Sequence, residues 1–216
     1  DRFFGILSEN GLLVAKKRTK PRTTDSAHGM RVYPNLLLGN AVEQVFEAVV
    51  VDITYLDTLE GFLYLALVTD VFSRKIVGYD TSDSLELEGC LRAVKMAMGQ
   101  RPKNLPEGHT KHHSDRGSQY CSHRYIAFLK DSHVQISMAA TGSCYENAMA
   151  ERVNGILKTE FELATTLASK DIAKSLVHDA VRLYNTKRPH LKLNFLTPET
   201  VFLNGIQKLE KQLFVA

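Results

Sequence analysis

Three runs of β-branched and aromatic residues follow one another in the first half of the chain, at 46–57, 61–72 and 74–82. Runs of this kind are typical of β-strands. The breaks between them are short and contain Gly61 or a Ser-Arg pair, which suits tight turns. The pattern therefore predicts an antiparallel meander of three strands.

The middle of the chain switches between the period of a helix and the period of a strand. We predict that Ser84 begins the first of these helices. A meander followed by strand–helix units indicates an α/β fold with a mixed five-stranded sheet and helices on both faces. The expected order is helix, strand, helix, strand and helix over 84–98, 108–115, 118–132, 134–139 and 145–163.

The two ends of the chain predict helices around this core. Residues 1–10 have a helical pattern that ends near Gly11, and a basic stretch at 16–22 follows as a linker or arm. Ser169 is placed to cap a helix that stops before Pro189, and Thr197 with Pro198 opens a last short helix. The apolar stripe expected on the Ser169 helix consists of Ile172, Leu176, Val177, Ala180, Val181 and Tyr184.

These patterns divide the chain into three parts. Residues 1–43 are an N-terminal helix remnant with a basic linker or arm, residues 44–165 form the core, and residues 166–216 form a C-terminal helical extension. Since the chain begins at Asp1 rather than Met, we expect it to be a fragment of a longer protein.

The composition is that of a globular protein, with 44% hydrophobic and 24% charged residues among 216. No apolar run approaches the roughly 20 residues that span a bilayer, so no membrane partner is expected. Three scattered cysteines favour a reducing cytoplasm. Basic residues outnumber acids in 1–40 and 151–216, whereas acids outnumber basic residues in 41–150. That distribution suits a protein whose basic ends hold an anionic polymer and whose acidic centre gathers cations. The alternative is that such small imbalances arise by chance.

Asp52 is a carboxylate in the middle of an apolar strand. Its neighbours Val51 and Ile53 belong to one face of the strand, so Asp52 belongs to the other. A carboxylate in such a strand costs free energy unless a cation or hydrogen-bond donors compensate it. The alternative is an edge strand on which the acid faces water.

The segment HTKHHSDRGSQYCSH, at 109–123, offers either a histidine metal site or a single aspartate. The histidines lack the i, i+4 spacing of a helical zinc pair, and His112 and His113 point to opposite faces of a strand. Asp115 comes at the end of that strand, where open α/β sheets place their sites. We therefore favour Asp115, with His113 on the same face and able to hold a phosphate or water.

Glu151 is a third carboxylate of interest. On its helix it lies opposite the apolar side, clustered with Asn147 and Lys158 and near Asn154. The alternative is the solvated face of an amphipathic helix. Three acids on two strands and a helix suit hard cations, and Mg²⁺ is bound by a few carboxylates plus phosphate oxygens. Two such ions about 3.5–4 Å apart serve phosphodiester chemistry, and the chain has no nucleotide-binding glycine loop.

Several motifs of the chain resemble one family throughout. The segments DITYL, EGFLYLALVTDVFSRKIVGY, HHSDRGSQY, YENAMAERVNGILKTE and YNTKRPH are similar to OrfB-type bacterial insertion-sequence transposases, which have the integrase catalytic core of DDE transposases and retroviral integrases. Thirty-five residues lie between Asp115 and Glu151, the spacing of the best-known branch of that superfamily.

The resemblance implies a ribonuclease H-like core at 44–165 whose first and fourth strands are adjacent, with Asp52 beside Asp115. It implies that Asp52, Asp115 and Glu151 are catalytic and bind two Mg²⁺ or Mn²⁺ ions. It also implies that both ions are fully bound only when DNA is present. The implied function is metal-dependent DNA cleavage and strand transfer at insertion-sequence ends during transposition.

The implied partners are double-stranded DNA and further copies of the chain assembled on it, in the bacterial cytoplasm and on the nucleoid when bound. A nuclease that hydrolyses without joining, and a copy that only binds DNA, are the competing interpretations. The residues that we expect to contact DNA are Lys158, Asn147, Asn154, Arg116, His113, Lys16, Lys17 and Arg18.

Overall fold

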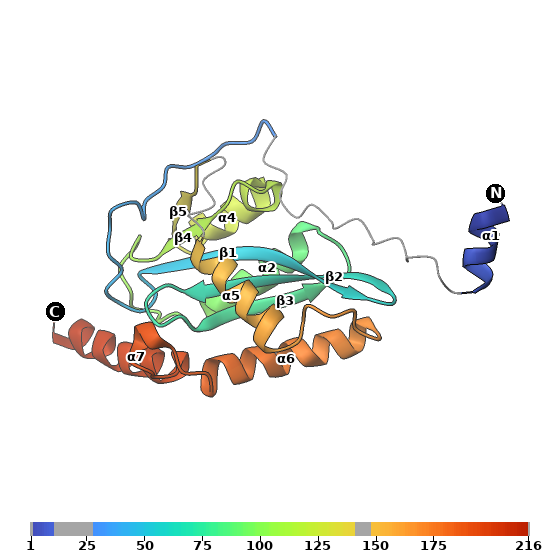
Figure 1. The fold of residues 1–216 in the computed structure, drawn as a ribbon. Coiled ribbons are helices and arrows are strands. Elements are labelled where there is room, and N and C mark those ends of the chain that lie inside the picture. The colour runs from blue at the N-terminus through green and yellow to red at the C-terminus, as the bar shows by residue number, and fades with distance from the viewer. Residues whose placement is uncertain (1, 11–27, 141–147, 216) are drawn as a thin grey trace.

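A computed structural model describes residues 2–10, 28–140 and 148–215 of the chain. A five-stranded sheet lies at its centre, in the order β3-β2-β1-β4-β5 (Figure 1). The first three strands pair antiparallel, whereas β4 pairs parallel to β1 and β5 parallel to β4. The predicted meander and mixed sheet are therefore confirmed. The strands are β1 (Ala48–Thr58), β2 (Gly61–Asp70), β3 (Ile76–Ser82), β4 (Lys111–Ser114) and β5 (Gln135–Met138).

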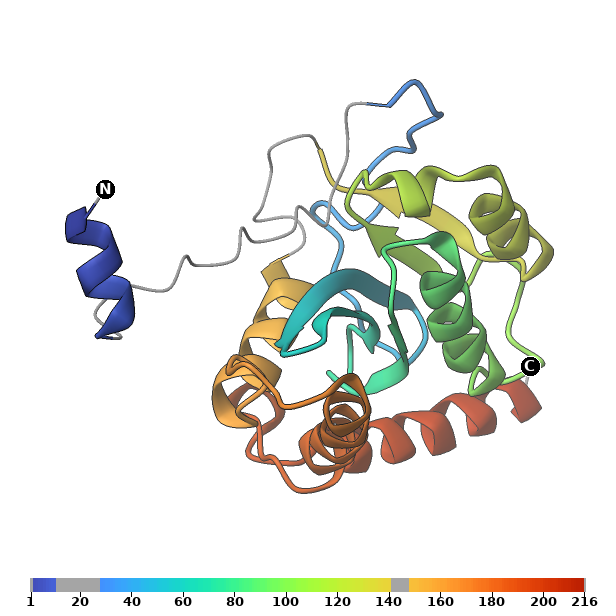
Figure 2. The ribbon, with the colours of Figure 1, turned by 90° about the vertical axis from the view of Figure 1, so that its right-hand side faces the viewer.

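Helices cover both faces of this sheet (Figures 1 and 2). One face packs against α2 and α4, and the other packs against α5 and α6. None of the helices in the described ranges is long and apolar enough to cross a membrane. The helices are α1 (Arg2–Glu9), α2 (Leu87–Gly99), α3 (Ser118–Cys121), α4 (His123–Asp131), α5 (Ala148–Glu160), α6 (Lys170–Thr186) and α7 (Pro198–Val215), with a 3-10 turn, η2, at Leu191–Leu193.

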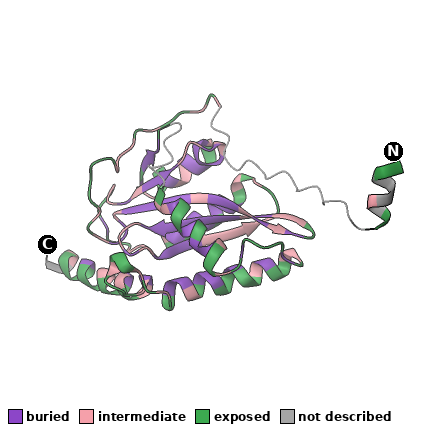
Figure 3. Cartoon of the chain, viewed as in Figure 1, coloured by how far each residue is buried: buried purple, intermediate pink, exposed green. Residues whose placement is uncertain are grey.

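The alternation of side chains along β1 assigns its residues to two separate cores. Val51 and Ile53 pack with α2 and α4, whereas Leu56 packs with α5 and α6. The sheet between these layers is largely buried (Figure 3). Because Asp52 alternates with Val51 and Ile53, its side chain belongs to the α5 face.

Two helix starts differ from the predictions because turns intervene. The chain bends after β3, so α2 begins at Leu87, with Glu86 rather than Ser84 at the N-cap position and no side-chain cap. The helix expected over 118–132 is interrupted at Ser122, which has extended backbone angles. Its hydroxyl accepts a hydrogen bond from the Tyr125 amide and so caps a new helix, α4.

The C-terminal helices also differ in part. Ser169 caps α6 as predicted, by accepting a hydrogen bond from the Ile172 amide. The stripe on α6 is narrower than expected, because Ile172 and Leu176 are 48% and 40% exposed. The last helix, α7, has 18 residues and is not short. Phe202 and Leu209 pack into the core near β1, and this tertiary contact stabilises a longer helix than local sequence indicates.

Candidate active site

Asp52 lies on the central strand of the sheet. Because β1 is flanked by β2 and β4, the alternative of an edge strand is wrong. The side chain is only partly exposed, and Asn154 of α5 donates a hydrogen bond from Nδ2 to Asp52 Oδ2 over 2.6 Å. A helix that crosses this face of the sheet therefore contributes a donor to this partly exposed carboxylate.

Asp115 follows directly after β4, which lies parallel to β1. Val50 is paired with His113 in this register, so continuing it by two residues sets Asp52 opposite Asp115. The Gly117 amide donates to Asp115 Oδ1 over 2.9 Å. A Cβ atom on Gly117 would lie only 3.0 Å from that oxygen, so glycine permits this close approach at the start of α3. The adjacency of the first and fourth strands is confirmed.

The two aspartates influence each other electrostatically. The pKa of Asp52 is raised from 3.8 to about 7, first by burial and then by the charge of Asp115. The hydrogen bonds from Asn154 and from the Ile53 backbone act in the opposite direction, and the charge of Glu151 raises the pKa further as the smallest contribution. Two carboxylates held together in this way form an oxygen donor set with excess negative charge, which fits a hard cation such as Mg²⁺.

Glu151 is exposed in the first turn of α5, at the rim of this pair. Within residues 2–10, 28–140 and 148–215, no group of three or more His, Cys, Asp or Glu side chains is assembled closely enough to hold a metal ion. The structure thus brings Asp52 and Asp115 together, while Glu151 lies nearby and does not complete a three-carboxylate metal site with them.

His112 and His113 of the segment at 109–123 serve in packing. His112 Nε2 hydrogen bonds with the Tyr125 hydroxyl over 2.9 Å, and His113 Nδ1 hydrogen bonds with the Ser137 hydroxyl over 2.8 Å. Their partners lie on α4 and β5, so the prediction that the two rings point to opposite faces is confirmed. Both side chains are fully buried. A DNA phosphate cannot reach His113 in this packing, which corrects its predicted position at the DNA surface.

The other expected DNA contacts have different environments. The Lys158 ammonium lies 4.5 Å from the centre of the Tyr55 ring, on the Asp52 side of α5. Arg116 donates from Nε to the Ala139 carbonyl over 2.9 Å, next to Asp115. Asn154 is 6% exposed and its amide nitrogen is committed to Asp52, so its position is that of a carboxylate partner. Asn147, Lys16, Lys17 and Arg18 lie outside the described residues.

Sequence reasoning missed Asp70, a buried carboxylate at the end of β2. Its oxygens accept hydrogen bonds from the Phe46 amide, the Ser73 amide and the Ser73 hydroxyl. These contacts tie the turn between β2 and β3 to the segment that precedes β1, so Asp70 has a structural role. The alternation along 61–72 alone does not distinguish a buried aspartate such as Asp70 from a solvent-exposed aspartate at the end of a strand.

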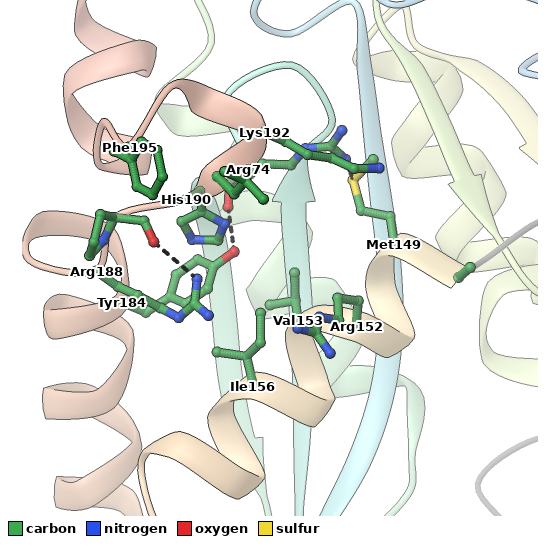
Figure 4. A pocket seen from close by; sticks show the side chains of 13 residues that line it. Arg74, Met149, Arg152, Val153, Ile156, Tyr184, Arg188, His190, Lys192 and Phe195 are labelled. Atoms are coloured by element: carbon green, nitrogen blue, oxygen red, sulfur yellow. Dashed lines mark hydrogen bonds between the residues drawn. The ribbon is translucent and has the colours of Figure 1, made fainter.

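A basic pocket on the other flank of α5 was also missed. It has a volume of about 780 Å³, and its cations come from the β2–β3 turn, from α5 and from the segment after α6 (Figure 4). We call it the α5–α6 pocket. The available sequence signal was the motif YNTKRPH at 184–190, which supplies four of its lining residues, Tyr184, Arg188, Pro189 and His190.

Comparisons with known proteins agree with this geometry. Two models described as "Integrase core domain" match residues 43–144 and 132–198. The chain is 37% identical to "Insertion element IS600 uncharacterized 31 kDa protein" of Shigella sonnei, covering 92% of this chain and 72% of that protein. It is 36% identical to "Transposase InsF for insertion sequence IS3A" of Escherichia coli (strain K12), covering 89% of this chain and 67% of that protein.

A solved structure shows the same fold at low sequence identity. The HTLV-2 integrase catalytic core domain in complex with magnesium superposes with a TM-score of 0.57 and is 16% identical, covering 73% of this chain and 96% of that chain. The predicted ribonuclease H-like fold is therefore confirmed.

Proposed function

We propose that this chain, which belongs to the integrase-core family of insertion-sequence transposases, cleaves DNA at the ends of an insertion element and joins those ends to target DNA. One observation carries the proposal for this chain's own residues. Asp52 and Asp115 face each other across the parallel β1–β4 pair, and the pKa of Asp52 is raised to about 7 by burial and by its neighbour. Perturbed carboxylates of this kind are typical of functional sites.

The residues that would hold Mg²⁺ or Mn²⁺ are Asp52, Asp115 and Glu151. When bound, two such ions activate an attacking oxygen and stabilise the leaving oxygen of a phosphodiester. The carboxylates fit this role because they supply the oxygen ligands that these cations prefer. Since Glu151 stands at the exposed rim, we propose that the ions are held fully only when DNA supplies further oxygens.

The remaining residues position the reacting groups. Asn154 orients the Asp52 carboxylate and the Gly117 amide orients that of Asp115. We propose that Lys158 and Arg116 contact DNA phosphates beside the carboxylates, with Asn147 and the basic stretch Lys16, Lys17 and Arg18 also on the DNA. No serine or tyrosine nucleophile is required for this chemistry.

The assembly and place of action follow from the same proposal. Each of the two ends of an element needs a catalytic site, so we propose that several copies of the chain assemble on DNA. The substrate of such an assembly is the bacterial chromosome, which places the protein in the cytoplasm and on the nucleoid when it is bound.

The experiment is a joining assay with the chain, Mg²⁺, labelled ends of the native element and an unlabelled target DNA. We expect cleaved ends and, in addition, products in which the label is joined to target. Cleavage without joined products favours the nuclease interpretation. Binding of the ends without either product favours a copy that only binds DNA, and both of these results contradict the proposal.

Variants at the carboxylates test the residue assignment. We expect Asp52→Asn, Asp115→Asn and Glu151→Gln each to reduce cleavage and joining to background, because each keeps its shape and loses the metal-binding charge. Asp57→Asn is the matched control, since Asp57 is on the same strand as Asp52 and hydrogen bonds with Thr166 instead. A site variant that folds and keeps near-normal activity removes that residue from the assignment.

A further inference from the structure

The α5–α6 pocket lies on the flank of α5 that faces away from Asp52. Arg152 and Ile156 of α5 form one wall, and His190 and Phe195 come from the segment after α6 (Figure 4). Arg152 follows Glu151 directly, so the pocket begins about one helix diameter, ~10 Å, from the candidate active site. A volume of about 780 Å³ is in the size range of cavities that enclose small ligands.

The charges around the pocket favour an anion. Arg74, Arg152, Arg188 and Lys192 line it, and no acidic side chain is among its described lining residues. Arg188 is held by Glu160, with nitrogen–oxygen distances of 2.6 and 2.7 Å. Across the described ranges neither Arg152 nor Lys192 forms an ion pair, so both cations are available to a phosphate.

His190 places an uncharged polar group at the wall of the same cavity. Its Nε2 atom is buried and has no hydrogen-bond partner within the described residues. Burial, followed by the charges of Arg188 and Arg74, lowers the pKa of His190 to about 4, so the ring is neutral at ordinary pH. A neutral imidazole nitrogen can donate to or accept from the polar edge of a nucleobase, whichever tautomer is present.

The rim of the pocket has exposed apolar side chains. Phe195 and Leu191 are 69% and 74% exposed, on the turn that follows α6. Asn194 and Phe195 both have positive φ angles, 52° and 61°. Such a backbone is unfavourable for a phenylalanine, and strained residues of this kind cluster at binding sites. An exposed ring beside unpaired cations is the combination on which unpaired bases stack in single-stranded nucleic-acid sites.

We propose that the α5–α6 pocket binds one nucleotide that is unstacked from the DNA substrate, with its phosphate against Arg152 and Lys192 and its base against Phe195. This inference rests on the proposed function for the identity of the polymer as DNA. A pocket of this volume between α5 and the segment after α6 is too small for a paired duplex, whereas a single displaced nucleotide fits it. The nucleotide would come from the DNA adjoining the reacting phosphate, on the other side of α5.

The test compares two DNA duplexes that differ only in a short single-stranded 5′ overhang. The overhang carries 2-aminopurine, whose fluorescence reports a change in base stacking. Binding is measured in EDTA with the Asp52→Asn chain, so that no cleavage interferes. We expect the overhang duplex to bind about tenfold more tightly than the blunt duplex, which is the size of one base–aromatic contact.

The pocket variants are Phe195→Ala and Lys192→Ala, each in the same Asp52→Asn background. We expect each to remove the preference for the overhang and the fluorescence change, with little effect on the blunt duplex. Leu203→Ala and Lys208→Ala are matched controls, because both residues are exposed on α7 and outside the pocket. These controls should keep the preference.

Three results would overturn the inference: no preference in the parent chain, a preference that survives both pocket variants, or pocket variants that weaken both duplexes equally. Sedimentation of the same proteins measures how many copies assemble. If the pocket variants change that number and keep the overhang preference, the pocket is a contact between copies and the inference is overturned. Failure of the joining assay together with an intact, pocket-dependent preference contradicts only the proposed function.

Discussion

Asp52 raises the free energy of the folded chain when it is ionised, because burial and Asp115 raise its pKa from 3.8 to about 7. A carboxyl with a higher pKa in the folded state favours folding below about pH 4, and this contribution is lost as the pH rises to about 7. We therefore predict that Asp52→Asn, measured in EDTA by chemical denaturation, becomes more stable than the parent across that range. The gain above pH 7 should be on the order of 4 kcal/mol, since the pKa rises by about three units and one pKa unit is worth about 1.4 kcal/mol.

Asp57→Asn serves as the control for this stability measurement, because it removes a carboxylate from the same strand away from the pair. Its stability relative to the parent should show no comparable rise between pH 4 and 7. A pH-independent difference for Asp52→Asn would mean that neither burial nor Asp115 raises the pKa of Asp52 in the folded protein.

Lys158 can be tested against a lysine in a similar local setting. Lys158 of α5 lies over the ring of Tyr55 in β1. Lys95 of α2, on the opposite face of the sheet, lies over the ring of Phe128 in α4. We predict that Lys158→Ala weakens binding to DNA ends and lowers the salt dependence of that binding by the amount expected for the loss of about one phosphate contact. Lys95→Ala should do neither. Binding titrations over a series of salt concentrations measure this. An unchanged salt slope for Lys158→Ala would assign Lys158 to the solvated face of α5.

At the scale of elements, two serines with similar sequence signals have different roles. The Ser169 hydroxyl accepts the Ile172 amide at the start of α6, over 3.2 Å, whereas Ser84 precedes α2 without capping it. We predict that Ser169→Ala lowers the free energy of unfolding by about 1 kcal/mol and that Ser84→Ala changes it by less than about 0.5 kcal/mol. Chemical denaturation of both variants checks this, and equal effects would contradict the assigned cap.

At the scale of the molecule, α6 packs against the sheet, and α7 packs against α6 and against the segment before β1. Val177, Val181 and Tyr184 of α6 bury β2 residues such as Leu65 in one core. We predict that a chain ending at residue 165 does not unfold cooperatively, because the lost burial, about 1.5–3 kcal/mol for each large side chain, exceeds a typical domain stability. Circular dichroism during thermal unfolding measures this.

A chain ending at residue 197 keeps α6 and is the control for that truncation. It loses the packing of Phe202 against Phe46, whose ring centres are 5.6 Å apart, and the Lys75–Glu199 ion pair. We expect it to fold with reduced stability. Cooperative unfolding of the 165-residue chain would show that residues 166–216 are a separable extension. The division of the chain at 43/44 and 165/166 stays a prediction.

The sequence by itself determined the features that depend on neighbouring residues. Alternation placed Asp52 on a different face from Val51 and Ile53, and the same period separated His112 from His113, because side chains alternate along any strand. Ser169 was identified as a cap because a cap involves residues three apart. The motifs along the chain, together with the spacing between Asp115 and Glu151, resembled the family that the comparisons show.

Only the tertiary structure decided which distant residues meet. It placed β1 at the centre beside β4, directed Asn154 to Asp52 instead of to the surface, and buried His113 against Ser137. It also assembled the α5–α6 pocket from segments far apart in the chain. Such contacts depend on how strands pair and how helices cross the sheet, and local periodicity carries no information about either.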